Sequence, residues 1–325
     1  MIVLSHKDVG ALLPMHEAIE VVDRAMREVS RGATQLPLRF GVPVGGGNLM
    51  GVMAGAMDAP ACYGVKLVSL FAENPARGLS SHRGAIVLFE AQTGGAVAMM
   101  DASLLTAIRT AAASAVATRA LARTDAHVLT LIGYGEQAWH HLKAMAAVRP
   151  ITQVVVTGRR LEQAQAFVTR AQARFGALDI RAEAEVEKAV RGADIICTVT
   201  ASPNPVLHGA WLEAGMQLNL VGASQANARE VDDDVIARGH VWVDYLPSAL
   251  AQAGEIVDMI KAGTLRESDL KGEIGATLEG KTGARSAPDE ITIYRSLGVA
   301  AQDLACAWHV LERARQAGAG QEVMF

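Results

Sequence analysis

Apolar residues recur along the chain with two different spacings, and the change of spacing divides the chain into regions. Residues 14–30 carry an apolar side chain every three or four positions, which predicts an amphipathic helix. Between residues 32 and 101 the pattern changes to short runs, often rich in Val and Leu, that are bounded by Gly, Pro or Asn. Such runs predict a mostly antiparallel sheet of about five or six strands. The clearest segments are 36–44, 48–56, 63–71, 84–90 and 95–101.

The second half of the chain alternates apolar segments with amphipathic ones. It follows an Ala-rich segment, residues 103–123, which has no interior Gly or Pro and predicts a helix. Buried strands alternating with helices are typical of a parallel sheet with crossover helices. The predicted strands are 128–132, 153–157, 179–182, 194–198, 217–221 and 240–244. Beyond them the pattern indicates mainly helices.

The predicted fold class is therefore α/β: a Rossmann doubly wound parallel sheet plus a second, α+β domain with a mostly antiparallel sheet. We expect a substrate domain over residues 1–118 that is completed by a C-terminal helix within 299–325. The dinucleotide-binding domain is expected over residues 119–298.

Composition and charge mainly argue against nucleic acids and membranes as partners. The net charge of -4 gives no reason to expect nucleic acid or an anionic membrane as a partner. The first residues are too polar for a signal peptide, and no stretch is long and apolar enough to span a membrane. The three cysteines, Cys62, Cys197 and Cys306, lie far apart without a metal-binding spacing, and the histidines form no cluster. We expect a cytoplasmic protein with no metal site.

A glycine-rich turn marks the predicted nucleotide site. Gly133, Gly135 and Ala138 lie between a predicted strand and a predicted helix, the context that gives such a motif its value. Gly133 would allow the tight turn, Gly135 would let the backbone approach a pyrophosphate, and Ala138 would keep helix and strand close. The helix N-terminus adds unpaired N–H groups and a partial positive charge. Glu136 and Gln137 belong to the same predicted contact set.

The end of the second strand bears on which dinucleotide is bound. Residues 153–157 lead into Gly158, Arg159 and Arg160, with no carboxylate to accept hydrogen bonds from the ribose 2′-OH of NAD. A guanidinium can instead bind a 2′-phosphate through two hydrogen bonds. We therefore favour NADP(H), with Arg159 as the better candidate and Arg160 as the second. NAD(H) and a pair of merely solvated arginines remain open. Further predicted cofactor contacts, at or just after the ends of later strands, are Thr200 and Val221.

Several stretches, in order along the chain, resemble the ornithine cyclodeaminase/mu-crystallin family. They are VKLVS around Lys66, the long segment GLSSHRGAIVLFEAQTGGAVAMMDASLLTAIRTAAASAVAT, IGYGEQA, LNLVGASQANARE and ITIYRSLGVAAQDLA. The resemblance implies two domains, a homodimer built by the N-terminal sheet, and a C-terminal helix that returns to that sheet. It also implies small amino or imino acids as substrates, bound between the domains against the nicotinamide. Thr110 would touch the cofactor phosphates.

The same resemblance implies which side chains meet the substrate. Arg39, Lys66 and Arg109 correspond to the basic residues that bind the substrate carboxylate in the family. Three cations can hold a carboxylate by charge-assisted hydrogen bonds, although ordinary structural ion pairs are the alternative. Ser81 and His82 lie where the family often has a polar pair facing the site. Lys66, Ser81 and His82 are each candidates to deliver the proton that the developing amine needs.

One position departs from the cyclodeaminases of the family, which resemble one another in carrying Gly-Asp where this chain has Ala223-Ser224. That aspartate assists attack and amine loss, whereas a serine cannot act as a base without an activating partner. Ser224 resembles the mu-crystallin branch, whose members resemble ketimine reductases, and it stays in the predicted catalytic set. We expect NAD(P)H-dependent reduction of a small, for example cyclic, imine carboxylate, or the reverse oxidation. NAD-dependent ornithine cyclodeamination and a non-catalytic NADPH-dependent binding protein are the alternatives.

Overall fold

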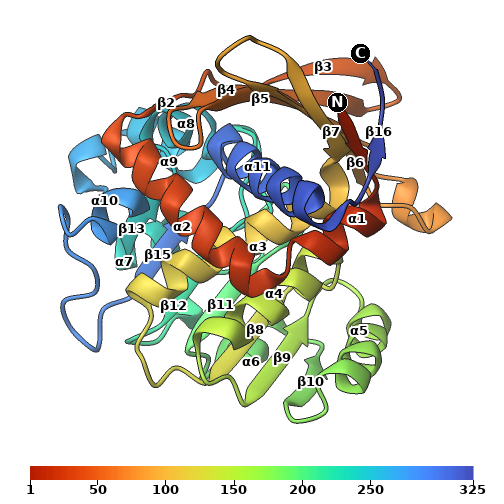
Figure 1. The fold of residues 1–325 in the computed structure, drawn as a ribbon. Helices are drawn as coiled ribbons and strands as arrows, with labels where there is room; N and C mark the ends of the chain where they lie inside the picture. The colour runs from red at the N-terminus through yellow and green to blue at the C-terminus, as the bar shows by residue number, and fades with distance from the viewer. Residues whose placement is uncertain (325) are drawn as a thin grey trace. The chain divides into compact units, whose positions relative to one another are not determined.

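Two β-sheets organise the chain, one in each of two structural units (Figure 1). The computed structural model describes residues 1–324. The first unit consists of Met1–Ala113 together with the chain from Gly298 onward, and the second unit is Ser114–Leu297. The boundary between Ala113 and Ser114 falls inside one helix, α3 (Ala102–Leu121).

The sheet of the first unit is mostly antiparallel, which confirms the prediction. Its order is β16-β1-β7-β6-β5-β4-β2, with β3 also paired to β4, and only the β1–β7 pair among the described strands is parallel. The strands are β1 (Ile2–Leu4), β2 (Thr34–Gln35), β3 (Phe40–Gly45), β4 (Asn48–Met57), β5 (Cys62–Leu70), β6 (His82–Glu90), β7 (Ala96–Asp101) and β16 (Gln321–Glu322). The five predicted segments became β3 to β7, and the short edge strands β1, β2 and β16 extend the sheet.

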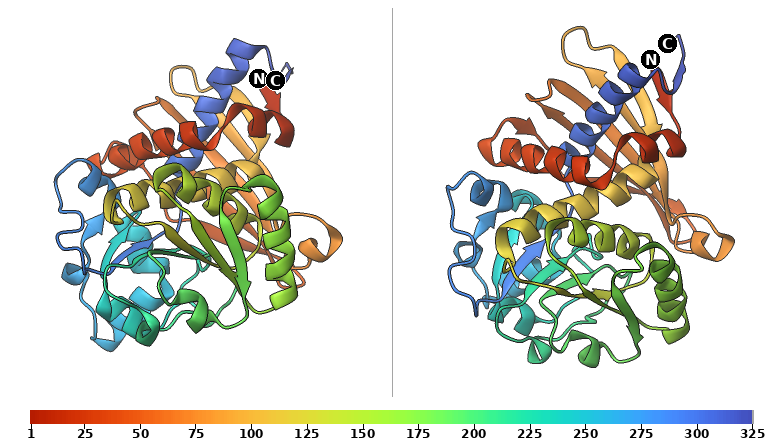
Figure 2. Two further views of the ribbon diagram at one scale, coloured as in Figure 1. Left: turned by 90° about the horizontal axis from the view of Figure 1, so that it is seen from below. Right: turned by 60° about the horizontal axis from the view of Figure 1, so that its bottom comes forward.

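Helices cover one face of this sheet. Besides the first part of α3, the helices of the unit are α1 (His6–Leu12), α2 (Met15–Arg31), the 3₁₀ turn η1 (Asn74–Arg77) and α11 (Ala300–Ala317). Helix α11 packs on β4, β5 and β6, and α2 packs on α11 (Figures 1 and 2). The apolar positions of α2 that recur every three or four residues, such as Ala18, Val22 and Val29, are buried, as the pattern predicted.

The opposite face of the same sheet carries exposed apolar side chains. Phe40 on β3 pairs with Val52, which pairs with Leu67 on β5, so these three side chains share one face. Phe40 is 60% exposed and Leu67 is 37% exposed. Tyr63 stacks on Phe89 of the neighbouring strand with ring centroids 5.1 Å apart. A continuous apolar sheet face of this kind is unusual on a monomer surface.

The sheet of the second unit is parallel throughout and has the doubly wound order. The order is β10-β9-β8-β11-β12-β15-β13-β14, and Figure 2 shows helices on both sides of the sheet. The strands are β8 (Val128–Ile132), β9 (Gln153–Thr157), β10 (Asp179–Glu183), β11 (Ile195–Thr198), β12 (Gln217–Leu220), β13 (His240–Val243), β14 (Gly272–Glu273) and β15 (Thr292–Arg295). The chain reverses direction across the sheet between β8 and β11, which is where such folds bind ligands.

The remaining helical segments connect these strands. They are α4 (Glu136–Val148), α5 (Leu161–Arg174), α6 (Val186–Val190), η2 (Gly209–Trp211), α7 (Asp233–Arg238), α8 (Leu246–Gln252), α9 (Gly254–Ala262), η3 (Glu267–Asp269) and α10 (Ile274–Leu278). The expectation that the last part of the chain is mainly helical was wrong at β15. Its residues Thr292 to Arg295 are all buried, because the strand inserts between β12 and β13. None of the helices in the described part of the chain has the length and hydropathy that crossing a membrane requires.

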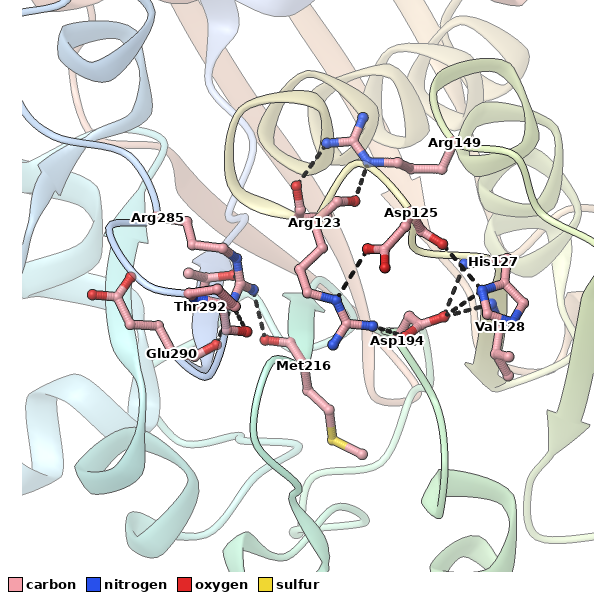
Figure 3. Close-up of polar contacts among 12 residues, drawn as sticks. Arg123, Asp125, His127, Val128, Arg149, Asp194, Met216, Arg285, Glu290 and Thr292 are labelled. Carbon is pink, nitrogen blue, oxygen red and sulfur yellow. Dashed lines mark hydrogen bonds and ion pairs between the residues drawn. The ribbon is translucent and has the colours of Figure 1, made fainter.

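Charged side chains fix the amino ends of the parallel strands (Figure 3). Asp194, which precedes β11, accepts hydrogen bonds from the backbone N–H groups of His127 and Val128 at 2.8 and 3.0 Å, where β8 begins. Asp194 also forms an ion pair with Arg123. One carboxylate therefore ties the starts of two neighbouring strands together.

Two further arginines hold the C-terminal end of α3, also visible in Figure 3. The Arg149 guanidinium donates to the carbonyl oxygens of Thr118, Ala122 and Arg123 at 2.8 Å each. Arg285 donates to the carbonyl oxygen of Leu121 at 2.7 Å. The last carbonyls of a helix have no partners within it, so these cations satisfy acceptors that would otherwise be unpaired.

Candidate functional site

The glycine turn lies where the two halves of the parallel sheet meet. Strand β8 ends at Ile132, and the backbone N–H of Gly133 donates to the carbonyl oxygen of Thr157 at the end of β9 at 2.8 Å. Gly133 has φ 122°, and a Cβ atom on it would lie 2.7 Å from the carbonyl oxygen of Val199, just after β11. Only glycine fits both the backbone angle and the space. The turn is thus packed between the ends of β9 and β11.

Gly135 is different, because nothing within the protein requires it to be glycine. It is the N-cap of α4 with φ -84°, and a Cβ atom on it would meet no atom within 4 Å. No described side chain caps α4, which leaves its first N–H groups available to an acceptor from outside the helix. The buried Oε1 atom of Gln137 also has no hydrogen-bond partner among the described residues. Free backbone donors at a helix start beside an open glycine fit the pyrophosphate of a dinucleotide.

The two candidate arginines for a 2′-phosphate follow β9. Arg159 and Arg160 are both exposed, and neither forms an ion pair within the described residues. Just before them, a Cβ atom on Gly158 would lie 2.7 Å from Cε1 of Tyr134, so the tyrosine ring of the glycine turn rests on Gly158. The guanidinium groups are therefore free to bind an anion at this end of the sheet.

The other predicted cofactor contacts of this unit lie at the same edge of the sheet, because parallel strands all end there. Thr200 follows β11 and hydrogen-bonds to Glu230 through both its backbone N–H and its hydroxyl group, at 2.8 and 2.7 Å. Val221 is buried directly after β12. Ser224 is partly exposed in the following loop, and no described side chain hydrogen-bonds to its hydroxyl group. The structure thus gives Ser224 no activating base.

Two predicted basic residues meet an acidic residue that was not predicted in the core of the first unit. Lys66 on β5, Arg109 on α3 and Asp303 on α11 are only 2%, 4% and 1% exposed. Asp303 Oδ2 lies 2.8 Å from Lys66 Nζ, and Asp303 Oδ1 accepts a hydrogen bond from Arg109 Nε at 2.8 Å. Arg109 Nη1 also donates to Gln302 Oε1 at 2.9 Å. We call Lys66, Arg109 and Asp303 the buried charge cluster.

Burial and neighbouring charges shift the pKa values of this cluster. Burial, and after it the positive charge of Arg109, lowers the pKa of Lys66 to about 7, although Asp303 acts in the opposite direction. Burial would raise the pKa of Asp303, but the two cations outweigh it and lower that pKa below its usual value. Asp303 therefore stays ionised, while Lys66 can exchange a proton near neutral pH.

Asp303 was missing from the predicted set. It lies in the first turn of α11, where a negative charge is favoured by the helix dipole. The signal in the sequence was a single carboxylate in the apolar run AAQDLACAW, matched by the lysine that interrupts the apolar strand β5. A buried charge implies an oppositely charged partner elsewhere in the chain. That inference is possible only when both segments are known to be buried.

The remaining predicted residues of the first unit surround this cluster. Arg39 is half-buried, donates to the carbonyl oxygen of Gly298 at 3.3 Å and lowers the pKa of Lys66. Gly298, with φ 78°, leaves no room for a side chain, since its Cβ atom would lie 2.4 Å from Arg109 Nη1. Thr110, next to Arg109 on α3, is buried.

Ser81 and His82 form the predicted polar pair. The Ser81 hydroxyl lies 2.9 Å from His82 Nδ1. The His82 ring keeps an exposed surface, yet partial desolvation and then the charges of Lys66 and Arg109 lower its pKa. His82 is thus close enough to the cluster to sense its charge, and its imidazole is neutral at neutral pH.

These features define a two-unit α/β protein with a Rossmann-type dinucleotide turn and a separate cluster of buried cations. The chain belongs to the ornithine cyclodeaminase/mu-crystallin family, whose sequence profile matches residues 1–318.

Several relatives match this chain over its full length. The Δ1-pyrroline-2-carboxylate reductase of Bacillus cereus is 33% identical over 327 residues, covering 100% of both chains. The structure of the Thermococcus litoralis Δ1-pyrroline-2-carboxylate reductase in complex with NADH and L-proline has a TM-score of 0.96 and 32% identity, covering 99% of this chain and 100% of that one. An archaeal alanine dehydrogenase dimer with bound NAD has a TM-score of 0.93 and 30% identity, covering 100% and 99%.

The two glycines of the turn give a paired test of the nucleotide site. Gly133→Ala should lower the free energy of unfolding by about 1–3 kcal/mol, because of its positive φ and the contact with Val199. Gly135→Ala should lower it by about 1 kcal/mol or less, because its Cβ atom has space and the only cost is that of an alanine N-cap. Only the bound dinucleotide would then meet that methyl group, so the Kd of NADPH should rise at least about tenfold in Gly135→Ala. Urea unfolding and a fluorescence titration measure the two effects; unchanged NADPH affinity in Gly135→Ala would contradict the assignment.

Proposed function

We propose that this protein is an NAD(P)H-dependent oxidoreductase that reduces a small imine carboxylate, for example a cyclic one, or oxidises the matching amino acid. The observation that carries the proposal is the grouping of three basic side chains in the first unit. Asp303 pairs with Lys66 and Arg109, and Arg39 is near enough to lower the pKa of Lys66. The two named reductases and the NADH and L-proline in one of their structures support the same chemistry.

The grouped basic side chains make a carboxylate the expected ligand. A buried cation is costly unless an anion pairs with it, and removing one partner of such a pair leaves an uncompensated charge. Asp303 pairs with Lys66 and Arg109 at 2.8 Å each, so its two oxygens are engaged on two cations at once. An incoming α-carboxylate would accept hydrogen bonds from the guanidinium groups of Arg109 and Arg39.

Reduction of an imine needs a hydride on carbon and a proton on nitrogen. The dinucleotide, when bound, supplies the hydride. Of the three candidate proton donors, Lys66 suits the step best, because a pKa near 7 lets its ammonium group give up a proton at neutral pH. His82 has a lowered pKa and is mainly neutral there, and the Ser81 hydroxyl is a weak acid. Lys66 is therefore our proposed general acid, with Arg109 and Arg39 orienting the substrate.

The test of this function follows NADPH absorbance across a panel of cyclic imine carboxylates and of keto acid plus amine pairs. We expect turnover with at least one cyclic imine carboxylate. Release of ammonia and proline from ornithine without added reductant would instead establish the cyclodeaminase alternative, which Ser224 without a base disfavours. Tight NADPH binding with no turnover on any member of the panel would indicate a binding protein.

Lys66→Ala tests the proposed proton donor. The variant should lower kcat for imine reduction at least about 100-fold, the range expected for loss of general acid catalysis, while NADPH binding stays unchanged. In the wild-type enzyme the rate of reduction should fall as pH rises through about 7, because Lys66 loses its proton there, and the rate of amino-acid oxidation should rise. The exposed Lys188→Ala serves as the matched control. A Lys66→Ala enzyme with the wild-type pH profile would remove Lys66 from this role.

We further propose that NADP(H) is preferred over NAD(H), because two unpaired arginines and no carboxylate follow β9. Arg159→Ser should lower kcat/KM for NADPH at least about tenfold and leave that for NADH nearly unchanged, since only NADPH carries the 2′-phosphate. The exposed Arg191→Ser is the control, because Arg191 already pairs with Glu187. An equal loss with both cofactors, or a wild-type preference for NADH, would overturn the proposal.

The exposed apolar sheet face supports a homodimer, and the dimeric alanine dehydrogenase relative agrees with it. Burying this face against a second copy would remove Phe40, Leu67 and their neighbours from water. Leu67→Glu places a charge in that interface and should shift the protein from dimer to monomer in light scattering after size-exclusion chromatography. Ala166→Glu, an exposed change on α5, should leave the dimer intact. A monomeric wild-type protein would contradict the proposal.

A cytoplasmic location agrees with the state of the cysteines. Cys62, Cys197 and Cys306 are buried and unpaired. Burial raises the pKa of Cys62 and of Cys197 to about 12, so both remain thiols at neutral pH. Unpaired cysteines of this kind are typical of proteins in a reducing compartment.

A further inference from the structure

Glu230 is a buried carboxylate whose partners all lie at the ends of two neighbouring strands. It is 3% exposed and stands at the end of the loop that follows β12. Its side chain accepts hydrogen bonds from the Thr198 hydroxyl at 2.8 Å, from the Thr200 N–H at 2.8 Å and from the Thr200 hydroxyl at 2.7 Å. It also accepts from the N–H of Gly222 at 2.6 Å. One carboxylate thereby links the ends of β11 and β12.

The backbone of the same residue closes the loop after β11. The carbonyl oxygen of Glu230 accepts hydrogen bonds from the N–H groups of Val206 and Leu207 at 2.8 and 3.1 Å. The loop after β11 is therefore hydrogen-bonded to Glu230 both near its beginning, at Thr200, and near its end, at Val206. The loop after β12 is hydrogen-bonded to the Glu230 side chain at Gly222, and Glu230 is itself the last part of that loop. One residue thus holds the ends of both loops.

Close packing makes this arrangement rigid. A Cβ atom on Gly222 would lie 2.1 Å from the carbonyl oxygen of Thr200 and 2.5 Å from Glu230 Oε1. The two loops thus touch at Gly222, and neither can shift without breaking a hydrogen bond to the carboxylate. A displacement of Glu230 would therefore shift the chain at the ends of both β11 and β12.

Burial and hydrogen bonding act in opposite directions on Glu230. Burial raises the pKa of Glu230 above its usual value, even though four hydrogen bonds act to lower it. A raised pKa means that the ionised form is disfavoured relative to the protonated form, compared with the same group in water. The four hydrogen bonds from Thr198, Thr200 and Gly222 therefore hold the buried side chain in place against this desolvation.

We propose that Glu230 is a positioning residue for the dinucleotide: it fixes the two loops that carry Thr200, Val221 and Ser224 in the conformation that binds the cofactor. This inference rests on the proposed function, since it assumes that the edge of the sheet beside the glycine turn holds a dinucleotide. Glu230 acts through Thr200 and Gly222 and is not itself expected to touch the cofactor.

The experiment compares Glu230→Gln with Asp194→Asn by direct fluorescence titration with NADPH in the absence of substrate. Each variant replaces one carboxylate oxygen by an amide NH₂ group of similar size. Because the NH₂ group is itself a donor, it cannot accept a hydrogen bond from the backbone N–H groups that the carboxylate oxygen accepted. Asp194 is the matched control, because it ties strands β8 and β11 together at the opposite, amino end of the same sheet (Figure 3). Both variants should lower the Tm. Only Glu230→Gln should raise the Kd of NADPH, by at least about tenfold, and its KM for NADPH should rise more than its kcat falls.

Each outcome decides the inference. NADPH affinity unchanged in Glu230→Gln, or weakened equally in Asp194→Asn, would overturn it while leaving the proposed function in place. Failure of the wild-type protein to bind NADPH or NADH would overturn the proposed function and the inference with it. Should Glu230→Gln not fold, Glu230→Asp keeps two acceptor oxygens on a shorter side chain and should show the same selective loss of affinity. Wild-type affinity in that variant would equally overturn the proposal.

Discussion

The shared ion pair of Asp303 with Lys66 and Arg109 is the constraint on which the first unit depends. A strand, β5, and two helices, α3 and α11, each contribute one of these side chains, all three of them buried. Two buried cations without Asp303 would repel each other and lack any counter-charge, an arrangement that costs several kcal/mol. The same interaction that packs α11 on the sheet also arranges the cations that a substrate carboxylate would meet. Under the proposed function, folding and substrate binding would therefore use one set of contacts.

In the second unit, too, a carboxylate with several hydrogen-bond partners joins neighbouring segments, and this happens at both ends of the parallel sheet. Asp194 accepts the N–H groups where β8 begins, and Glu230 accepts those just beyond the ends of β11 and β12. Buried carboxylates can do this because they accept several hydrogen bonds at once. The difference lies in what the fixed segments carry. The amino end holds only the starts of strands, whereas the carboxyl end carries the glycine turn and the loops after β11 and β12.

Local patterns in the sequence predicted most of the fold, whereas the roles given to the predicted site residues remain predictions. The strands β3 to β7 and the glycine turn are encoded by runs of neighbouring residues, so their periodicity and their turns could be recognised directly. Strand β15 was missed because its short apolar run becomes a strand only through insertion between β12 and β13, far away in sequence. Asp303 and Glu230 were missed for a related reason. A lone acidic residue has no visible partner in a sequence, and its role appears only when distant donors are brought to it.

The division of the chain has a consequence for the order in which the protein is made. The first unit is interrupted by the whole of the second, since its two parts are Met1–Ala113 and the chain from Gly298 onward. A ribosome therefore exposes Lys66 and Arg109 long before it reaches Asp303, and the entire Rossmann unit can fold in the interval. A prematurely terminated chain would contain a complete nucleotide-binding sheet beside a domain whose charges are unbalanced. Until α11 with Asp303 has been made, Lys66 and Arg109 lack the carboxylate that pairs with them, so the core of the first unit can be completed only after the Rossmann unit has been synthesised.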